Sequence, residues 1–265
     1  MDARGNVFYT DLKQVWKIAP DGRKTVAVPA VHTHELCLDE RGNLYGEHLW
    51  YEGDRTRKWG HRVWRRSPGG AVTDVYGPRG GFRTDYSFVR DAAGNMYSAV
   101  EGTPTAIRRR APDGTVATIA LCRDCRHVRW MTAAADGTLY FTDSGDVRSV
   151  SPDGRISTLA RKLFSSGASH VPGRQDWRLL MGLWTDAERN VYVAVYGSRE
   201  VKRISPGGRV DVVARSRFPW APTGGLVTSN GDLWLLEATF TNAVRARRVS
   251  GFRANESPAS RKRSP

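Results

Sequence analysis

The stretch DARGNVFYTDLKQVWKIAPDG (residues 2–22) contains a pattern that returns along the chain. It opens with a D-x-x-G-N turn before an aromatic-rich segment and closes with a P-D-G turn. Degraded copies read DERGNLYG (39–46), VWRRSPGG (63–70), DAAGNMYS (91–98), IRRRAPDG (107–114) and ADGTLYFTDSGDVRSVSPDG (135–154). A pattern with a period of about 40–50 residues is typical of proteins in which each copy forms one supersecondary unit.

Both turns contain residues suited to a tight reversal of the chain. The first turn aligns Gly5, Gly42, Gly94, Gly137 and Gly231 in one column, with Arg189 in a sixth copy. The second turn recurs as Pro-Asp-Gly or Pro-Gly-Gly at 20–22, 68–70, 112–114, 152–154 and 206–208, with Ser250-Gly251 as its sixth copy. Aspartate and asparagine tolerate turn geometry and glycine supplies a positive φ, so both sites predict hairpins.

Short segments with alternating character lie between the turns, such as NVFYTD (6–11) and QVWKIA (14–19). Their period of two and their content of Val, Tyr, Trp and Thr predict β-strands. One copy therefore contains four antiparallel strands, ordered from an inner to an outer strand. Because one such sheet cannot bury both of its faces, we predict an all-β fold, a six-bladed β-propeller with its blades stacked in a ring.

The segments GNVFYTD (5–11), VWKIAPDG (15–22) and PTGGLVTSNGDLW (222–234) resemble NHL-type repeats. They are also similar to six-bladed propellers of the gluconolactonase and senescence-marker-protein group and of the streptogramin B lyases. The resemblance extends to about residue 252. It implies the propeller fold, but propellers of this kind include enzymes, sensors and scaffolds.

The predicted strands do not complete every blade. The second and third strands occur in all six copies, but the inner strand is found only at 35–39, 87–91, 130–134, 180–185 and 225–229, and the outer strand only at 24–28, 71–76, 115–119, 155–160 and 209–214. We therefore expect incomplete first and last blades in a single domain, residues 1–252, followed by a disordered basic tail, residues 253–265. We also expect that the natural chain is truncated here and that about 10–20 upstream residues supply the missing strands, after a signal peptide if the protein is secreted or periplasmic.

The chain is strongly basic, with 41 Lys and Arg against 27 Asp and Glu and a formal net charge of +14. Five of these cations share one position in the third strand: Lys17, Arg65, Arg109, Arg203 and Arg248. We interpret them as a solvated structural ring, so we do not expect a nucleic-acid partner, although the net charge alone favours RNA. We also expect the protein to be a monomer. No apolar run approaches the about 18 residues of a membrane span, and the given N-terminus shows no signal-peptide pattern.

Three cysteines are present. Cys37 lies in an apolar strand, which favours an inert core residue. Cys122 and Cys125 form a C-x-x-C motif without the second ligand pair of a zinc site or the βαβ context of a redox motif. This pattern leaves two alternatives open, a local disulfide or two free thiols.

Candidate binding residues gather where the outer strand of one blade crosses to the inner strand of the next. All six histidines fall on this rim of the predicted propeller: His32, His34, His48, His61, His127 and His170. Two long insertions, 47–61 and 164–179, fall there too. Since binding groups concentrate on loops held by a rigid scaffold, we expect this crossing rim to carry the main pocket.

The segment HTHE (32–35) is the densest local cluster. Alternation places His32 and His34 on the same side of a predicted strand, with Glu35 opposite them. Two imidazoles and a carboxylate can begin a site for a divalent metal such as Ca, Mg or Zn. The alternative is that one histidine ends the strand while the other faces solvent.

Further residues are expected around the same channel mouth. Those that begin neighbouring inner strands are Asp85, His127, Trp130, Asp176 and Trp177. The aromatic residues of the insertion 47–61, Trp50, Tyr51 and Trp59, should overhang the mouth, where they would either stack a ligand or pack the insertion onto the rim. Asp11 and Asp143 are instead expected to hold the loops that follow them through side-chain hydrogen bonds.

Three classes of function fit this pattern. We favour a non-catalytic propeller that binds a small molecule or a protein on the crossing rim. A metal-dependent hydrolase or lyase at the channel mouth is the alternative, although the motifs that supply the metal ligands in gluconolactonases are absent from the inner-strand openings. An RNA-binding propeller is the third class.

Overall fold

The structure is a computed structural model that describes residues 1–51, 59–82, 89–100, 102–164 and 180–252. The chain divides into two compact units, residues 1–121 (unit 1) and residues 122–265 (unit 2). The described residues form strands and turns and contain no helix. In this part of the chain, therefore, no helix has the length and apolar character needed to cross a membrane.

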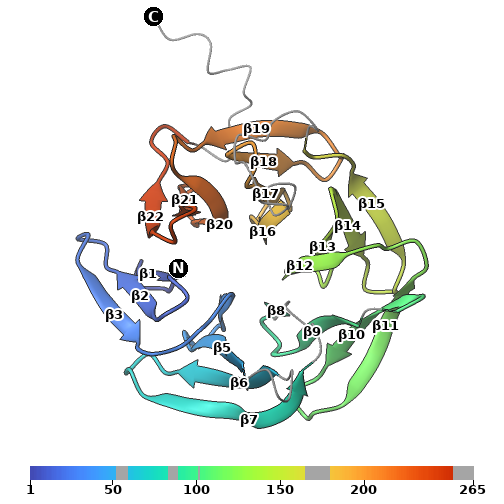
Figure 1. The fold of residues 1–265 in the computed structure, drawn as a ribbon, viewed down its shortest axis with the longest axis horizontal. Helices are drawn as coiled ribbons and strands as arrows, with labels where there is room; N and C mark the ends of the chain where they lie inside the picture. The colour runs from blue at the N-terminus through green and yellow to red at the C-terminus, as the bar shows by residue number, and fades with distance from the viewer. Residues whose placement is uncertain (52–58, 83–88, 101, 165–179, 253–265) are drawn as a thin grey trace, which may run out of the picture. The chain divides into compact units, whose positions relative to one another are not determined.

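Unit 1 carries the first three sheets, each an antiparallel meander in sequence order (Figure 1). The first consists of β1 (Val7–Thr10), β2 (Val15–Ile18) and β3 (Lys24–Val28). The second consists of β4 (Leu36–Leu38), β5 (Leu44–Tyr51), β6 (Trp59–Arg66) and β7 (Val72–Phe82). The third consists of β8 (Val89–Arg90), β9 (Met96–Val100), β10 (Thr105–Arg110) and β11 (Val116–Cys122).

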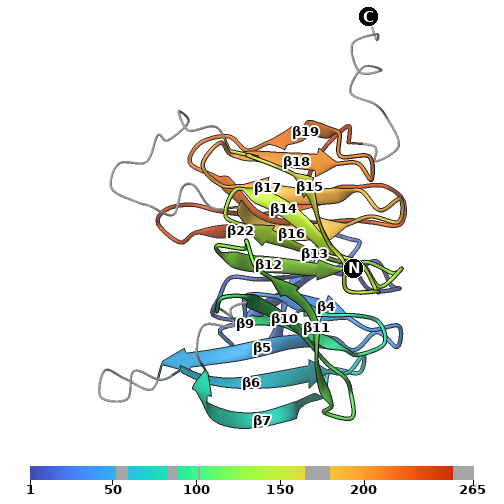
Figure 2. The same cartoon turned by 90° about the vertical axis from the view of Figure 1, so that its right-hand side faces the viewer.

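Unit 2 repeats the arrangement, and Figure 2 shows β17, β18 and β19 side by side. The fourth sheet consists of β12 (Val128–Ala133), β13 (Leu139–Asp143), β14 (Asp146–Val150) and β15 (Ile156–Ala160). The fifth consists of β16 (Leu180–Thr185), β17 (Val191–Val195), β18 (Glu200–Ile204) and β19 (Val210–Arg215). The sixth consists of β20 (Ala221–Val227), β21 (Leu233–Ala238) and β22 (Val244–Arg248).

Six antiparallel meanders of this kind are the blades of a six-bladed β-propeller, and the predicted fold class is confirmed. Among the described residues, the first and last sheets have three strands each and the other four sheets have four, as the strand count predicted. The prediction that residues 1–252 form one domain stays a prediction. The predicted disorder of the tail 253–265 lies outside the described residues.

The D-x-x-G-N turn is held by its aspartate. In the second sheet, Asp39 Oδ1 accepts a hydrogen bond from the Asn43 backbone N–H at 2.8 Å, and Asp39 Oδ2 accepts one from Asn43 Nδ2 at 2.8 Å. The hydroxyl of Tyr45 also donates to Asp39 Oδ2, at 3.1 Å. Gly42 takes a φ of 76°, a backbone angle that residues with a Cβ adopt only with strain. The same three contacts recur from Asp91 and from Asp186, so the repeated letters encode one hydrogen-bonded turn.

β17 shows how a blade of unit 2 is buried on both faces. All five of its residues are buried. Val191 and Val193 belong to one hydrophobic cluster, whereas Tyr192 and Ala194 belong to another. Because successive side chains of a strand point to opposite faces, neighbouring sheets of unit 2 cover both sides of β17.

Two predictions about the crossing rim are wrong in detail. His32, His34 and Glu35 do not alternate along a strand, because β4 begins only at Leu36. The insertion 47–61 is not a loop throughout, since β5 continues to Tyr51 and β6 already begins at Trp59, with these two residues paired. The aromatic residues at both ends of the insertion are of a type that suits a pleated strand.

Candidate functional site

The crossing between β3 and β4, residues 29–35, is here called the histidine crossing. It is held in unit 1 by the buried residue Thr33, whose backbone carbonyl accepts a hydrogen bond from Thr10 Oγ1 at 2.8 Å. Thr33 Oγ1 donates to the Glu47 carbonyl and accepts from the indole N–H of Trp64 at 3.2 Å. These contacts fix the backbone between His32 and His34.

The rings of His32 and His34 meet edge to face, with 4.9 Å between their centroids. His32 Nδ1 lies 3.0 Å from the Leu12 carbonyl oxygen, which can only accept, so Nδ1 carries the proton. In neutral His32 the Nε2 lone pair is then the acceptor for His34 Nε2–H, at 3.1 Å. His48 Nδ1 accepts the backbone N–H of His32 at 2.9 Å and completes a connected group of three histidines.

This environment favours uncharged imidazoles. Burial, and secondarily the neighbouring His32, lowers the pKa of His34 from 6.5 to about 4. Burial, followed by Arg62 and His32, also lowers the pKa of His48. A neutral imidazole is the form that binds a metal ion, but His34 Nε2 donates its proton to His32 Nε2, so an ion at this pair would have to displace that hydrogen bond. In the described part of the chain, moreover, the carboxylate of Glu35 does not complete a three-ligand group with the two histidines.

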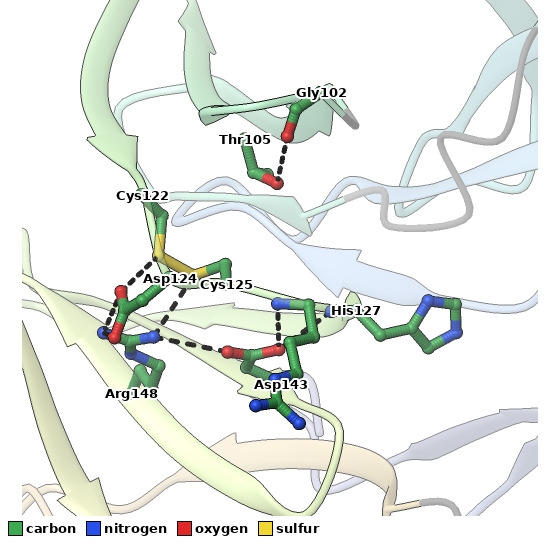
Figure 3. Close-up of a disulfide and its surroundings, with 9 residues drawn as sticks. Gly102, Thr105, Cys122, Asp124, Cys125, His127, Asp143 and Arg148 are labelled. Carbon is green, nitrogen blue, oxygen red and sulfur yellow. Dashed lines mark hydrogen bonds and ion pairs between the residues drawn. A yellow bond between two sulfur atoms is a disulfide. The ribbon is translucent and has the colours of Figure 1, made fainter.

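The crossing between β11 and β12, residues 122–127, is here called the disulfide crossing (Figure 3). Cys122 and Cys125 are joined by a disulfide, which settles the choice between the two predicted alternatives. Among the described residues, Cys122, Asp124 and Cys125 each place one potential metal-binding atom within 4.8 Å of the other two. The two sulfurs are bonded to each other, however, so they do not serve as thiolate ligands. Burial raises the pKa of the remaining thiol, Cys37, to about 12, in agreement with an inert core residue.

Asp143 anchors the disulfide crossing from the end of β13. Its Oδ1 accepts the backbone N–H groups of Arg126 at 2.9 Å and His127 at 2.8 Å, and its Oδ2 accepts from Arg148 Nη1 at 3.3 Å (Figure 3). Asp11 holds its own loop in the same way, accepting from the Gln14 backbone N–H at 2.9 Å. The prediction that each aspartate holds the loop that follows it is confirmed for Asp11. It is wrong for Asp143, which holds the crossing that precedes it in the sequence.

The crossing between β19 and β20, residues 216–220, is here called the aromatic crossing, and the sequence analysis missed it. Phe218 is 71% exposed and lies 6.3 Å from the 46% exposed ring of Phe240, measured between centroids. Arg199 lies over Phe218 at 5.9 Å, and Arg245 lies over Trp220 at 4.1 Å. The aromatic pair in RFPW (217–220), which falls at a crossing position, is the sequence feature that could have indicated this surface.

A buried carboxylate binds residues of the aromatic crossing and of the neighbouring strand. Glu237 on β21 is fully buried and accepts hydrogen bonds from Arg245 Nε at 2.7 Å and Arg247 Nη2 at 2.8 Å. Ser216 Oγ donates to the same carboxylate at 2.6 Å. Burial alone would raise the pKa of Glu237, but these three donors lower it below its ordinary value, so the side chain is held as an anion.

The predicted site residues are distributed over both units. His32, His34 and Glu35 lie in unit 1, whereas His127 and Trp130 lie in unit 2. His127 Nε2 accepts from Arg129 Nε at 2.5 Å, and Trp130 packs against a hydrophobic cluster of unit 2, so the indole serves the core. Those whose structure lies outside the described residues are Asp85, Asp176 and Trp177, together with the side chains of Trp50, Tyr51 and Trp59. That these residues surround one channel mouth, and that the pair binds a metal, stay predictions.

Three cations of the predicted basic column lie beside polar partners in their own sheets. Arg65 Nη2 lies 3.5 Å from Thr73 Oγ1. The others form ion pairs, Arg203 with Asp211 at 3.3 Å and Arg248 with Asp232 at 2.7 Å. These contacts agree with a structural role of the column in the blades, but Arg203 is buried and is therefore not solvated as predicted.

No protein-family model matches the chain. Over 141 residues the sequence is 27% identical to the E3 ubiquitin-protein ligase TRIM32 of Homo sapiens, and equally to that of Mus musculus. The match covers 47% of this chain and 20% of those proteins. The chain therefore corresponds to about a fifth of the length of the curated relatives it matches.

Solved structures share the fold over most of the chain. Virginiamycin B lyase from Staphylococcus aureus is 14% identical with a TM-score of 0.56, covering 94% of this chain and 83% of the lyase. A gluconolactonase from Xanthomonas campestris is 14% identical with a TM-score of 0.61, covering 88% and 79%. An auxiliary nutrient binding protein from Bacteroides ovatus is 11% identical with a TM-score of 0.62, covering 92% and 66%. The chain is thus a six-bladed β-propeller whose fold is similar to that of the streptogramin B lyases and gluconolactonases.

Proposed function

We propose that this protein is a non-catalytic β-propeller, monomeric by itself, that binds a partner on its crossing rim. The observation that carries the proposal is the aromatic crossing, where the exposed Phe218 lies beside the exposed Phe240 of the β21–β22 loop and under the guanidinium of Arg199. Aromatic residues and arginine are enriched at the centres of protein interfaces. Exposed phenylalanine rings that touch one another indicate an interaction surface more strongly than scattered ones do.

The chemistry of this surface favours a protein segment that carries acidic and apolar side chains. The guanidinium of Arg199 supplies positive charge over the ring of Phe218, and Arg245 supplies it over the ring of Trp220. The buried anion Glu237 orients Arg245 and Arg247 before any partner arrives. Such preorganisation lowers the entropy lost on binding.

The test is selection of binding sequences from a library of random 12-residue peptides displayed on phage, followed by affinity measurement. We expect enriched peptides to combine Asp or Glu with an aromatic or aliphatic residue. The double variant Phe218→Ala/Phe240→Ala should weaken their binding at least about tenfold. The matched control is Val210→Ala, which shortens another exposed apolar residue of unit 2.

Two results would count against this proposal. Equal peptide binding by the double variant and the wild type would remove the aromatic crossing from the site. Binding of single-stranded RNA that persists above about 0.2 M salt would instead favour the nucleic-acid class, because contacts to phosphate alone weaken steeply as salt rises.

A metal-dependent hydrolase or lyase is the second candidate, and the histidine crossing supports it. His32 Nε2 and His34 Nε2 lie 3.1 Å apart, and His34 is held uncharged. Imidazole nitrogens suit zinc better than calcium or magnesium, which prefer oxygen ligands. Zinc titration followed by calorimetry tests this candidate: one tightly bound ion that is lost in His34→Ala would support it, and no binding would reject it.

A further inference from the structure

The disulfide crossing contains two sulfurs in opposite surroundings. Cys122 ends β11 and is 2% exposed, whereas Cys125 lies in the crossing and is only half-buried. Arg148 Nη1 lies 3.5 Å from Cys125 Sγ, while Asp124 Oδ1 lies 3.5 Å from Cys122 Sγ (Figure 3). A cation therefore contacts the accessible sulfur and an anion contacts the buried one.

The arginine is held in place by the blade. Arg148 comes from β14, its side chain is 11% exposed, and it pairs with Asp124 at 2.9 Å and with Asp143 at 3.3 Å. Asp143 also binds the backbone N–H groups of Arg126 and His127, so the crossing and the guanidinium share one anchor. The contact between Arg148 and Cys125 is thus part of a connected polar network within unit 2.

We propose that Cys122 and Cys125 form a redox-active pair in which Cys125 exchanges with an external low-molecular-weight thiol. The thiolate of that thiol attacks Cys125 Sγ, the bond between Cys122 and Cys125 breaks, and Cys122 leaves as a thiolate that takes a proton from solvent. A second external thiolate then attacks the external sulfur of the mixed disulfide and releases Cys125. Two thiols are oxidised to one disulfide, and the protein disulfide is reduced to two thiols.

The surroundings determine the direction of each step. Only Cys125 offers a sulfur to an incoming thiolate, because Cys122 is buried. Arg148 stabilises negative charge on Cys125 when this cysteine leaves in the second step. Asp124 and burial disfavour the thiolate of Cys122, which makes this thiol the slower nucleophile of the reduced pair.

Single-cysteine variants test the assignment with oxidised glutathione as the probe. Cys122→Ser should form a mixed disulfide at Cys125, detected by mass spectrometry of the folded protein, at least about ten times faster than Cys125→Ser forms one at Cys122. Equal rates, or no adduct in either variant, would overturn the proposal. Cys37 is present in both variants, and alkylation after unfolding reports its state.

Arginine variants in the Cys122→Ser background separate the role of Arg148 from general charge. Arg148→Gln should slow adduct formation at pH 7 about tenfold, whereas Arg148→Lys should retain most of the rate. The matched control Arg123→Gln removes an exposed cation of the same crossing and should leave the rate unchanged. If Arg148→Gln does not fold, the ratio of the adduct rates at Cys125 and Cys122 in the single-cysteine variants still tests the proposal. A rate in Arg148→Gln equal to that of the Cys122→Ser parent, or a rate lost equally in Arg123→Gln, would contradict the role of the guanidinium.

Discussion

The histidine crossing of unit 1 and the disulfide crossing of unit 2 are anchored at the same position of the repeat by different chemistry. Five residues after the Asn or Thr that ends the first turn stand His48 in one copy and Asp143 in another. His48 Nδ1 accepts the backbone N–H of His32, and Asp143 Oδ1 accepts those of Arg126 and His127. One structural task, capturing the backbone of the crossing, is performed by a neutral ring or by an anion.

A third crossing extends the comparison. The corresponding position in the last copy is Glu237, which does not bind the backbone of the aromatic crossing but binds Ser216 and two arginines. The anchor of this crossing is therefore a fully buried carboxylate that pairs with two partly exposed arginines, whereas the anchor of the histidine crossing is neutral. The repeat specifies where an anchor stands, and the individual residue decides whether charge is buried there.

The largest expected effect separates the charged anchor from the neutral one. Glu237→Ala should lower the free energy of unfolding by about 3–4 kcal/mol, because three hydrogen bonds to a buried carboxylate are lost while the partly exposed guanidinium groups of Arg245 and Arg247 regain water. His48→Ala should lower it by about 1 kcal/mol, the value of one hydrogen bond to a half-buried N–H. Urea unfolding monitored by tryptophan fluorescence measures both changes. Similar losses in the two variants would show that the burial of charge does not distinguish these anchors.

The next effect tests whether the histidine crossing is neutral. With a folded pKa of about 4 against 6.5, His34 binds a proton in the unfolded chain but not in the folded chain between these pH values. The unfolded state is therefore favoured as the pH falls through this window. The stability that the neutral His34 contributes is fully present above about pH 6.5, and its loss by about pH 4 lowers the free energy of unfolding by about 3 kcal/mol.

His34→Gln retains an N–H donor but does not titrate. We therefore expect the free energy of unfolding of this variant to fall less steeply than that of the wild type between pH 6.5 and pH 4, measured by urea unfolding at each pH. Carboxylates elsewhere contribute equally to both proteins and cancel in the difference. Parallel curves would mean that His34 is already charged in the folded protein.

The sequence was sufficient to predict the blades because their determinants are local. Asp39, Asn43 and Tyr45 form their hydrogen bonds within seven residues. Each copy of the D-x-x-G-N motif in the sequence therefore predicts where such a turn lies. The loop-holding role of Asp11 followed from the same local logic, whereas Asp143 binds residues of a crossing that lies 16 and 17 positions earlier in the sequence.

The site was harder to predict because its contacts join distant segments. Phe218 and Phe240 are separated by a whole hairpin, and nothing in either segment indicates that the two rings meet. His32 and His34 do contact each other, but through a bent crossing held by Thr33 and not through strand alternation. The spacing of Cys122 and Cys125 was compatible with thiols or a disulfide, since both states fit two intervening residues.

The smallest expected effect concerns the exposed rings of the aromatic crossing. Phe218→Ala should change the free energy of unfolding by less than about 0.5 kcal/mol, because a side chain that is 71% exposed loses little contact when it is shortened. Trp220→Ala should be more costly, since its half-buried ring stacks on Arg245, which also binds Glu237. The pair of variants, compared by urea unfolding, distinguishes a ring that builds the crossing from one that is presented to solvent. A loss above about 1 kcal/mol in Phe218→Ala would mean that this ring supports the fold. Phe240 would then be the one remaining phenylalanine of the proposed binding surface.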